Sequence, residues 1–264
     1  MILTSFLRGI FSANFFVASC GVALALFFDN RLLFPDLALL YSALLFAYTF
    51  LRGWGEIYKR KTFDKLAFKR YSLILICVGV LLLFFWYKTA FKIAPEWFLS
   101  GFMFLVYCFL RFRMGYIKRH ILFHALAKVI TVAMVWTMAI SGFRGFQIVS
   151  DSALFFFIFG LMIPFEIKDS DNDKHFTQAT LPQVLGDIHT KVVGYLLLLV
   201  SIIFMLSSHL DFIMKVAWSI ACVVAMCLVF LSNKSRTSLY FLALVDGVMW
   251  LPYLILICWQ WLGT

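Results

Sequence analysis

The stretch "VVGYLLLLVSIIFMLSS", which runs from Val192 to Ser208, contains no charged side chain. As a helix it is long enough, with tilt or interfacial ends, to cross the hydrocarbon core of a bilayer. Similar runs recur along a chain of 264 residues, of which 64% are hydrophobic and 14% are charged. A soluble domain is about half apolar and about a quarter charged. The sequence therefore predicts an integral membrane protein.

Nine apolar runs of this kind predict an all-α, polytopic fold with about nine transmembrane helices. Helices are expected because each satisfies its own backbone hydrogen bonds in lipid, and the alternating pattern of a membrane β-barrel is absent. No soluble domain or long linker interrupts the runs, so residues 1–264 are expected to form a single transmembrane domain. The predicted spans are residues 9–28, 34–54, 71–88, 96–112, 121–141, 150–166, 192–208, 212–232 and 238–260.

Lys and Arg residues divide unevenly between alternate connections of these spans. Seventeen fall on one side and five on the other, and Lys128 lies inside a span. Because basic residues accumulate on the cytoplasmic side, we expect a cytoplasmic N-terminus and an external C-terminus in the inner membrane of a cell. The net charge of +10 then reflects topology and attraction to anionic lipid, so no nucleic-acid partner is expected.

Acidic residues gather in "PFEIKDSDNDKHFTQATLP", Pro164–Pro182, on the predicted cytoplasmic side. On a helix Asp169 and Asp173 share a face and repel each other unless a cation lies between them. Carboxylates at the membrane–water boundary suit Mg²⁺, which takes oxygen ligands and commonly binds substrate phosphates as well. Asp169 and Asp173 are therefore the predicted ligands, with Glu166 and Asp171 in outer or solvent positions. The alternative is a solvated loop with incidental acids.

The phrase "TLPQVLG", Thr180–Gly186, follows the acidic residues and predicts a short ordered helix. Thr180 is a residue type that caps a helix, and Pro182 suits a first helical turn. Gly186 is expected to permit close packing at the other end of this helix.

The segment "EIKDSDNDKHFTQATLPQVLG" resembles the second aspartate-rich motif of the UbiA superfamily of intramembrane prenyltransferases. That motif has an acid, two further residues and then two Asp four positions apart, followed by a basic residue, a Thr-Leu-Pro stretch and a Gly. The corresponding residues in this chain are Glu166, Asp169, Asp173, Lys174, Thr180, Leu181, Pro182 and Gly186.

The resemblance implies a bundle of nine helices around a central cavity, with the reaction at the cytoplasmic side. It implies transfer of a prenyl group from an isoprenyl diphosphate to an aromatic or other lipophilic acceptor. Asp169 and Asp173 would be the catalytic, metal-binding aspartates, with Mg²⁺ as the cofactor between them and the diphosphate. Lys174, at the basic position of the motif, would bind the negatively charged diphosphate.

The family's first motif, typically Asn with two Asp at four-residue intervals, has no counterpart here. The corresponding stretch, "FAYTFLRGWGEIYKRK" at Phe46–Lys61, contains neither Asp nor Asn. Positions four residues apart on one helical face of this stretch are Tyr48, Arg52, Glu56 and Arg60. Of these, Glu56 could ligate a metal, and Arg52 could bind diphosphate through its guanidinium fork. The alternatives are that Arg52 is a topology charge, that catalysis has been lost, or that the chemistry differs.

Four more charged residues are candidates. By the same resemblance Lys118 and Arg119, in the fourth-to-fifth connection, would contact the diphosphate; a role as topology charges is equally open. Lys128 and Asp246 lie within predicted spans, where charges normally pair or face water. Either these two pair with each other, or Lys128 points into the cavity and Asp246 hydrogen-bonds within the bundle.

Two other classes of protein remain open. The missing first motif favours a catalytically degenerate lipid-binding or scaffold protein of the same fold, whereas the intact second motif disfavours it. A transporter is disfavoured by the single polar face and by the lack of broken helices in paired halves.

The charge distribution yields a test of topology. We expect segments 52–70, 111–119 and 166–191 on the cytoplasmic face, so a membrane-impermeant thiol reagent added outside should label Lys92→Cys and leave Lys174→Cys unlabelled. The unsubstituted protein gives the background from its native cysteines. Equal labelling at the two positions would disprove the topology.

Overall fold

The computed structural model describes residues 14–59, 65–89, 94–113, 121–174 and 180–262, and gives the backbone alone for 52–59, 65–74, 110–113, 121, 124 and 171–174. These described residues form ten α-helices with short π and 3-10 segments and no β-strand, which confirms the all-α class. The chain divides into two compact units, 1–93 and 94–264. A single domain over 1–264 stays a prediction.

Three helices make up the described part of the first unit: α2 (Phe15–Phe28), α3 (Phe34–Lys59) and α4 (Lys65–Lys88). Each packs against the next in the chain. Polar side chains shape the connection between α2 and α3. The Arg31 amide donates a 3.0 Å hydrogen bond to Asp29 Oδ1, and the Leu33 amide donates a 3.2 Å bond to Asp36 Oδ2. The second bond satisfies a backbone donor at the start of α3.

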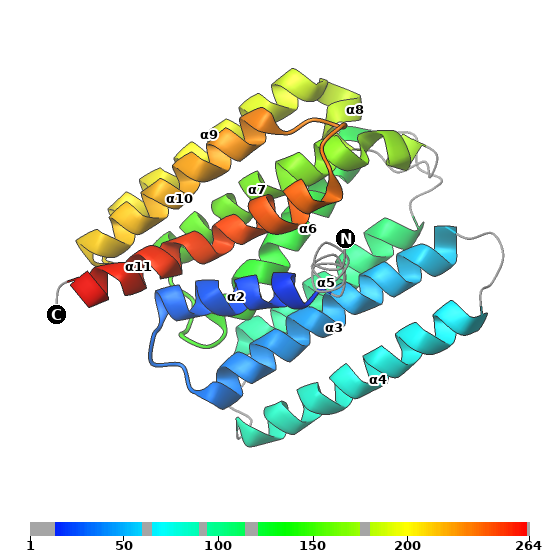
Figure 1. Cartoon of the computed structure of the whole chain (residues 1–264), viewed down its shortest axis with the longest axis horizontal. Coiled ribbons are helices and arrows are strands. Elements are labelled where there is room, and N and C mark those ends of the chain that lie inside the picture. The colour runs from blue at the N-terminus through cyan, green and yellow to red at the C-terminus, as the bar shows by residue number, and fades with distance from the viewer. Residues whose placement is uncertain (1–13, 60–64, 90–93, 114–120, 175–179, 263–264) are drawn as a thin grey trace, which may run out of the picture. The chain divides into compact units, whose positions relative to one another are not determined.

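The second unit contains the longer series of helices. α9 and α10 lie side by side, α11 follows α10, and α7 packs most extensively against α9 (Figure 1). The elements are α5 (Pro95–Arg113), α6 (Ile121–Ser141), α7 (Ile148–Lys174), α8 (Leu181–Leu185), α9 (Asp187–Ser207), α10 (Phe212–Leu231), the π-helical η3 (Tyr240–Val245), the 3-10 helix η4 (Asp246–Trp250) and α11 (Leu251–Leu262).

Five helical segments in the described chain are long and apolar enough to cross a membrane, as expected of a multi-pass membrane protein. They are Phe34–Leu51, Ile148–Ser170, Asp187–Ser207, Phe212–Leu231 and Tyr240–Leu262. Shorter apolar helical segments occupy the other four predicted spans: Phe15–Phe28, Leu75–Lys88, Pro95–Phe109 and Ala125–Ser141. That all nine cross the bilayer stays a prediction.

Four helices extend well beyond the predicted spans. α3 continues to Lys59 instead of ending at 54, and α4 begins at Lys65 instead of 71. α7 continues to Lys174 instead of ending at 166, and α9 begins at Asp187 instead of 192. An apolar run marks the part of a helix suited to hydrocarbon, whereas the helix itself can continue into water with polar side chains. The acidic residues of 166–174 are therefore helical.

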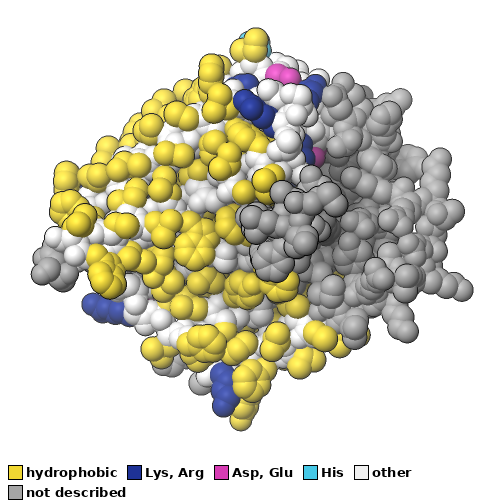
Figure 2. All heavy atoms as spheres, in the orientation of Figure 1, with side chains coloured by type: hydrophobic (Ala, Val, Ile, Leu, Met, Phe, Trp, Pro, Cys, Tyr) yellow, Lys and Arg dark blue, Asp and Glu magenta, His cyan; other side chains and the backbone are white. Residues whose placement is uncertain are grey.

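The outward surface of α9, α10 and α11 suits a lipid environment. Figure 2 shows mostly hydrophobic side chains over these helices, with charged side chains near the helix ends. Leu196, Ile203 and Phe230 are exposed there, at 56%, 61% and 68%. A surface with this many exposed large apolar side chains would promote aggregation in water, whereas contact with lipid tails is its normal environment.

Close helix contact in the second unit depends on small residues. A Cβ atom on Gly160 of α7 would lie 2.7 Å from Leu198 Cγ of α9, so this contact requires glycine. Nearby, Ser201 Oγ donates a 2.7 Å hydrogen bond to the Ala153 carbonyl and accepts a 2.9 Å bond from Trp218 Nε1. Ser201 thus joins α9 to α7 and to α10 inside an apolar core.

Segments of the second unit that are predicted to share a membrane side lie together. Lys191 Nζ at the start of α9 donates a 2.8 Å hydrogen bond to the Phe230 carbonyl near the end of α10. On the predicted outer side, the Phe146 amide donates a 3.3 Å bond to Glu96 Oε1 at the start of α5. Both contacts are those expected from helices that alternate in direction.

We expect Ser201→Ala to lower the free energy of unfolding by about 1–2 kcal/mol, because the buried Trp218 N–H loses its acceptor. Reversible unfolding in mixed micelles measures the change. Ser207→Ala is the matched control, since Ser207 is exposed on the same helix and bonds only the carbonyl of Ile203. Equal effects of the two substitutions would contradict the role of Ser201.

Candidate functional site

The acidic end of α7 is the centre of the candidate site. Because α7 is helical through Lys174, positions 169 and 173 lie one turn apart on one side of it, and position 171 lies on another. This confirms the helical register predicted for the acidic segment. The Asp169 side chain is partly exposed and makes no hydrogen bond or ion pair with any described residue. It is therefore available to a ligand.

Glu166 is buried, so a solvent role for it is wrong, whereas an outer role beside the metal ligands stays a prediction. Its side chain is 5% exposed, and its Oε1 lies 2.6 Å from Lys128 Nζ of α6. Its Oε2 accepts a 3.4 Å hydrogen bond from the Leu181 amide at the start of α8. One carboxylate thus ties α6, α7 and α8 together. Sequence spacing within the motif could not reveal a partner on another helix.

Lys128 and Asp246 do not pair with each other. Lys128 binds Glu166, and the positive charge that acts on Asp246 electrostatically is Lys168 of α7. Charged residues inside membrane spans usually pair, and Lys128 does, but its partner is the last residue of a predicted span and not a residue in the middle of one. Residues at the ends of the predicted spans were therefore also candidate partners for Lys128.

The predicted short helix after the acidic segment is confirmed as α8, with Thr180 at its N-cap and Pro182 in its first turn. Gln183 Nε2 donates a 2.6 Å hydrogen bond to the Ser170 carbonyl, and its Oε1 accepts a 3.3 Å bond from the Thr180 amide. Gln183 thereby fastens α8 to the acidic end of α7.

Gly186 ends α8 for a different reason from the one expected. Its φ is +82°, a region that residues with a Cβ rarely adopt, and a Cβ there would meet no atom within 4 Å. Glycine is required at this position by backbone conformation, and the expectation of close packing is wrong.

Several predicted site residues lie outside what the structure describes. Lys118 and Arg119 fall in 114–120, and the side chains of Asp173 and Lys174 are beyond the described atoms although their backbone is the end of α7. Arg52 and Glu56 are on α3 in the first unit, again with the backbone alone. Their convergence on Asp169 stays a prediction.

The donor atoms at the end of α7 fit Mg²⁺. This ion commonly takes one or two protein carboxylates and fills its other positions with water and phosphate oxygens. Asp169 offers a partly exposed carboxylate that has no partner among the described side chains, one turn before position 173. Among the described side chains, no group of three or more His, Cys, Asp or Glu residues gathers to hold a metal, so a closed site made wholly of those side chains is not present.

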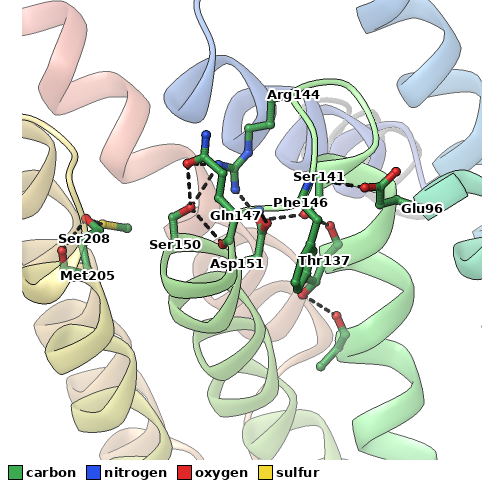
Figure 3. Close-up of polar contacts among 11 residues, drawn as sticks. Glu96, Thr137, Ser141, Arg144, Phe146, Gln147, Ser150, Asp151, Met205 and Ser208 are labelled. Atoms are coloured by element: carbon green, nitrogen blue, oxygen red, sulfur yellow. Dashed lines mark hydrogen bonds and ion pairs between the residues drawn. The ribbon is translucent and has the colours of Figure 1, made fainter. Parts of the chain in front are cut away.

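A second polar cluster lies at the opposite, predicted outer end of the second unit (Figure 3). Arg144 forms an ion pair with Asp151, whose carboxylate also accepts 2.6 Å hydrogen bonds from Ser141 Oγ and the Gln147 amide. The same guanidinium donates a 3.0 Å bond to Ser150 Oγ. Since Asp151 is saturated by these partners, the cluster secures the turn between α6 and α7. Position along the chain indicated only a topology charge at Arg144.

Comparison with protein-family profiles, with curated proteins and with solved structures finds no match for this chain. The likeness to the UbiA superfamily therefore depends on the residues of 166–186 and on the order of the helices.

We expect Lys128→Met to lower the free energy of unfolding by about 3 kcal/mol, because it removes the cation that lies 2.6 Å from the buried Glu166 carboxylate. Adding Glu166→Gln should recover part of that loss, since the charge that Lys128 offsets is then removed as well. Unfolding in mixed micelles measures both variants. Lys215→Met, on the predicted outer side, is the control and should change stability little. A loss that is the same with and without Glu166→Gln would show that the pair is not coupled.

Proposed function

We propose that the chain is a membrane-embedded prenyltransferase that uses an isoprenyl diphosphate and a lipophilic acceptor. The observation that carries this proposal is the end of α7. There Asp169 has no partner among the described residues and lies one helical turn from position 173, beside α8, which Gln183 fastens in place. The residue pattern from Glu166 to Gly186 supports the same reaction class through its resemblance to the UbiA motif.

In this proposal Asp169 and Asp173 hold Mg²⁺, which when bound supplies charge neutralisation for the departing diphosphate. The basic residues Arg52, Lys118, Arg119 and Lys174 stabilise the same negative charge. Glu56 is an additional candidate ligand from α3. The Lys128–Glu166 pair does not contact the diphosphate; it positions the acidic end of α7 relative to α6 and α8.

The proposed setting is a bundle of nine spans around a central cavity, in the inner membrane, with the N-terminus in the cytoplasm. The segment 166–191 then faces the cytoplasm, where soluble or membrane-bound diphosphates and Mg²⁺ reach it. The prenyl tail and the acceptor lie among apolar helices, where removal from water favours both.

A catalytically degenerate lipid-binding or scaffold protein is the second candidate. Two observations favour it: Phe46–Lys61 contains no Asp or Asn, and Lys128 is neutralised by Glu166. Such a protein would retain the helices without binding diphosphate.

Binding of a prenyl diphosphate analogue, titrated with and without Mg²⁺, separates the two candidates. We expect Mg²⁺-dependent binding by the unsubstituted protein and its loss in Asp169→Asn and Asp173→Asn, since each removes one of the proposed ligands. Asp171→Asn is the matched control, because position 171 lies on another side of α7, and its effect should be mild.

The absence of Mg²⁺-dependent binding in the unsubstituted protein would favour the scaffold. Retained binding in both Asp169→Asn and Asp173→Asn, with loss only in Asp171→Asn, would move the site to another face of α7. Extraction of lipid products after incubation with labelled prenyl diphosphates and candidate acceptors then identifies the acceptor.

A further inference from the structure

The last membrane-spanning segment is interrupted by a change of helix type at Asp246. Residues Tyr240–Val245 are π-helical, and the Asp246 amide closes this stretch by bonding to the Phe241 carbonyl. A 3-10 helix begins at Asp246, and the Leu251 amide bonds to the Val248 carbonyl. Pro252 contributes to the change because it has no N–H to give that carbonyl an α-helical bond. Such interruptions are frequent at functional sites.

Asp246 is a buried acid without a partner. It is 6% exposed and makes no hydrogen bond or ion pair with any residue in the described chain. The adjacent Val245, Val248 and Met249 are also buried and apolar. An acid in this position is costly unless something pairs with it, and intramembrane acids commonly mark ligand or ion pathways.

The position of Lys168 limits the kind of ligand that Asp246 could bind. Its Nζ lies 4.9 Å from the centre of the Phe241 ring, so the ammonium is held by a cation–π contact. It acts on Asp246 electrostatically without forming an ion pair with it. A second cation placed at Asp246 would be repelled by Lys168, whereas a neutral hydrogen-bond donor would not.

The same contacts place Asp246 in relation to the acidic end of α7. Phe241 packs against Phe165 of α7, with ring centres 5.8 Å apart, and is fully buried. Lys168 directly precedes Asp169 in the chain. The interrupted segment of the last span is thus bound to the part of α7 that leads into the candidate site.

We propose that Asp246 binds a hydroxyl group of a lipophilic molecule that enters from the membrane. The carboxylate accepts the hydrogen bond, and the surrounding apolar side chains contact the rest of the molecule. Where the chain acts as the prenyltransferase proposed above, this molecule is its acceptor; that identification rests on the proposed function, whereas the binding of a hydroxyl group does not.

The test uses 4-nonylphenol and its methyl ether 4-nonylanisole, which differ in the hydroxyl donor, with the full-length protein in lipid nanodiscs. We expect the ratio of their affinities to favour the phenol about tenfold more in the unsubstituted protein than in Asp246→Leu, as expected of one buried hydrogen bond. The Asp246→Leu protein supplies the baseline for partitioning into lipid. Asp211→Leu, at an exposed acid before α10, should keep the unsubstituted ratio.

Three results would overturn the proposal. The first is an affinity ratio that is the same in the unsubstituted and Asp246→Leu proteins. The second is tighter binding of decylamine than of nonylphenol through Asp246, which would indicate a cation site. The third is a large fall in melting temperature in both Asp246→Asn and Asp246→Leu, which would show a structural role. No fall is expected, because Asp246 has no partner to lose among the residues that the structure describes.

The assay contains neither diphosphate nor Mg²⁺, so its outcome is independent of the test of Asp169. If the unsubstituted protein binds diphosphate with Mg²⁺ but prefers nonylphenol to nonylanisole no more than Asp246→Leu does, only the role of Asp246 is overturned. A retained preference without diphosphate binding would leave a hydroxyl-binding membrane protein and remove the prenyltransferase.

Discussion

The structure depends on the cost of leaving a polar group unpaired away from water. Backbone amides and carbonyls meet this constraint by forming helices, and the described chain is helical wherever it is strongly apolar. Side chains meet it by pairing, as Trp218, Ser201 and the Ala153 carbonyl do between three helices. The same constraint makes the exceptions informative, because a buried charge without a partner has to be explained by something other than stability.

The two ends of the second unit satisfy this constraint differently. At the predicted outer end, Arg144 and Asp151 pair with each other and with the surrounding turn, so the Asp151 carboxylate is fully engaged by the protein. At the other end Glu166 pairs with Lys128 and accepts a hydrogen bond from α8, whereas Asp169, three residues later, has no partner within the described part of the chain. A carboxylate with a structural role and the carboxylate proposed to bind a ligand are therefore one turn apart on α7. Pairing of Glu166 fixes the direction of the helix that presents Asp169.

Much of the helical architecture could be predicted from periodicity and apolar length. α6, α10 and the last span begin and end within a few residues of the predicted limits, and α8 was predicted with its cap and its proline. Polar extensions of α7 and α9 were missed because hydropathy responds to the solvent around a helix and not to its hydrogen bonds. The role of Gly186 was misjudged because close packing and positive φ both select glycine.

The sequence by itself determined that the chain is an all-α membrane protein and that four of its 13 acids fall within the eight residues 166–173. These properties depend on local apolar length and on spacing along a helix, which are read directly from residue order. Only the tertiary structure decided that Lys128 pairs with Glu166, that Lys168 lies on Phe241, and that Asp246 is buried with no partner in the described chain. Each of those facts involves residues on different helices. Their proximity is set by how the helices pack, and no local pattern encodes it.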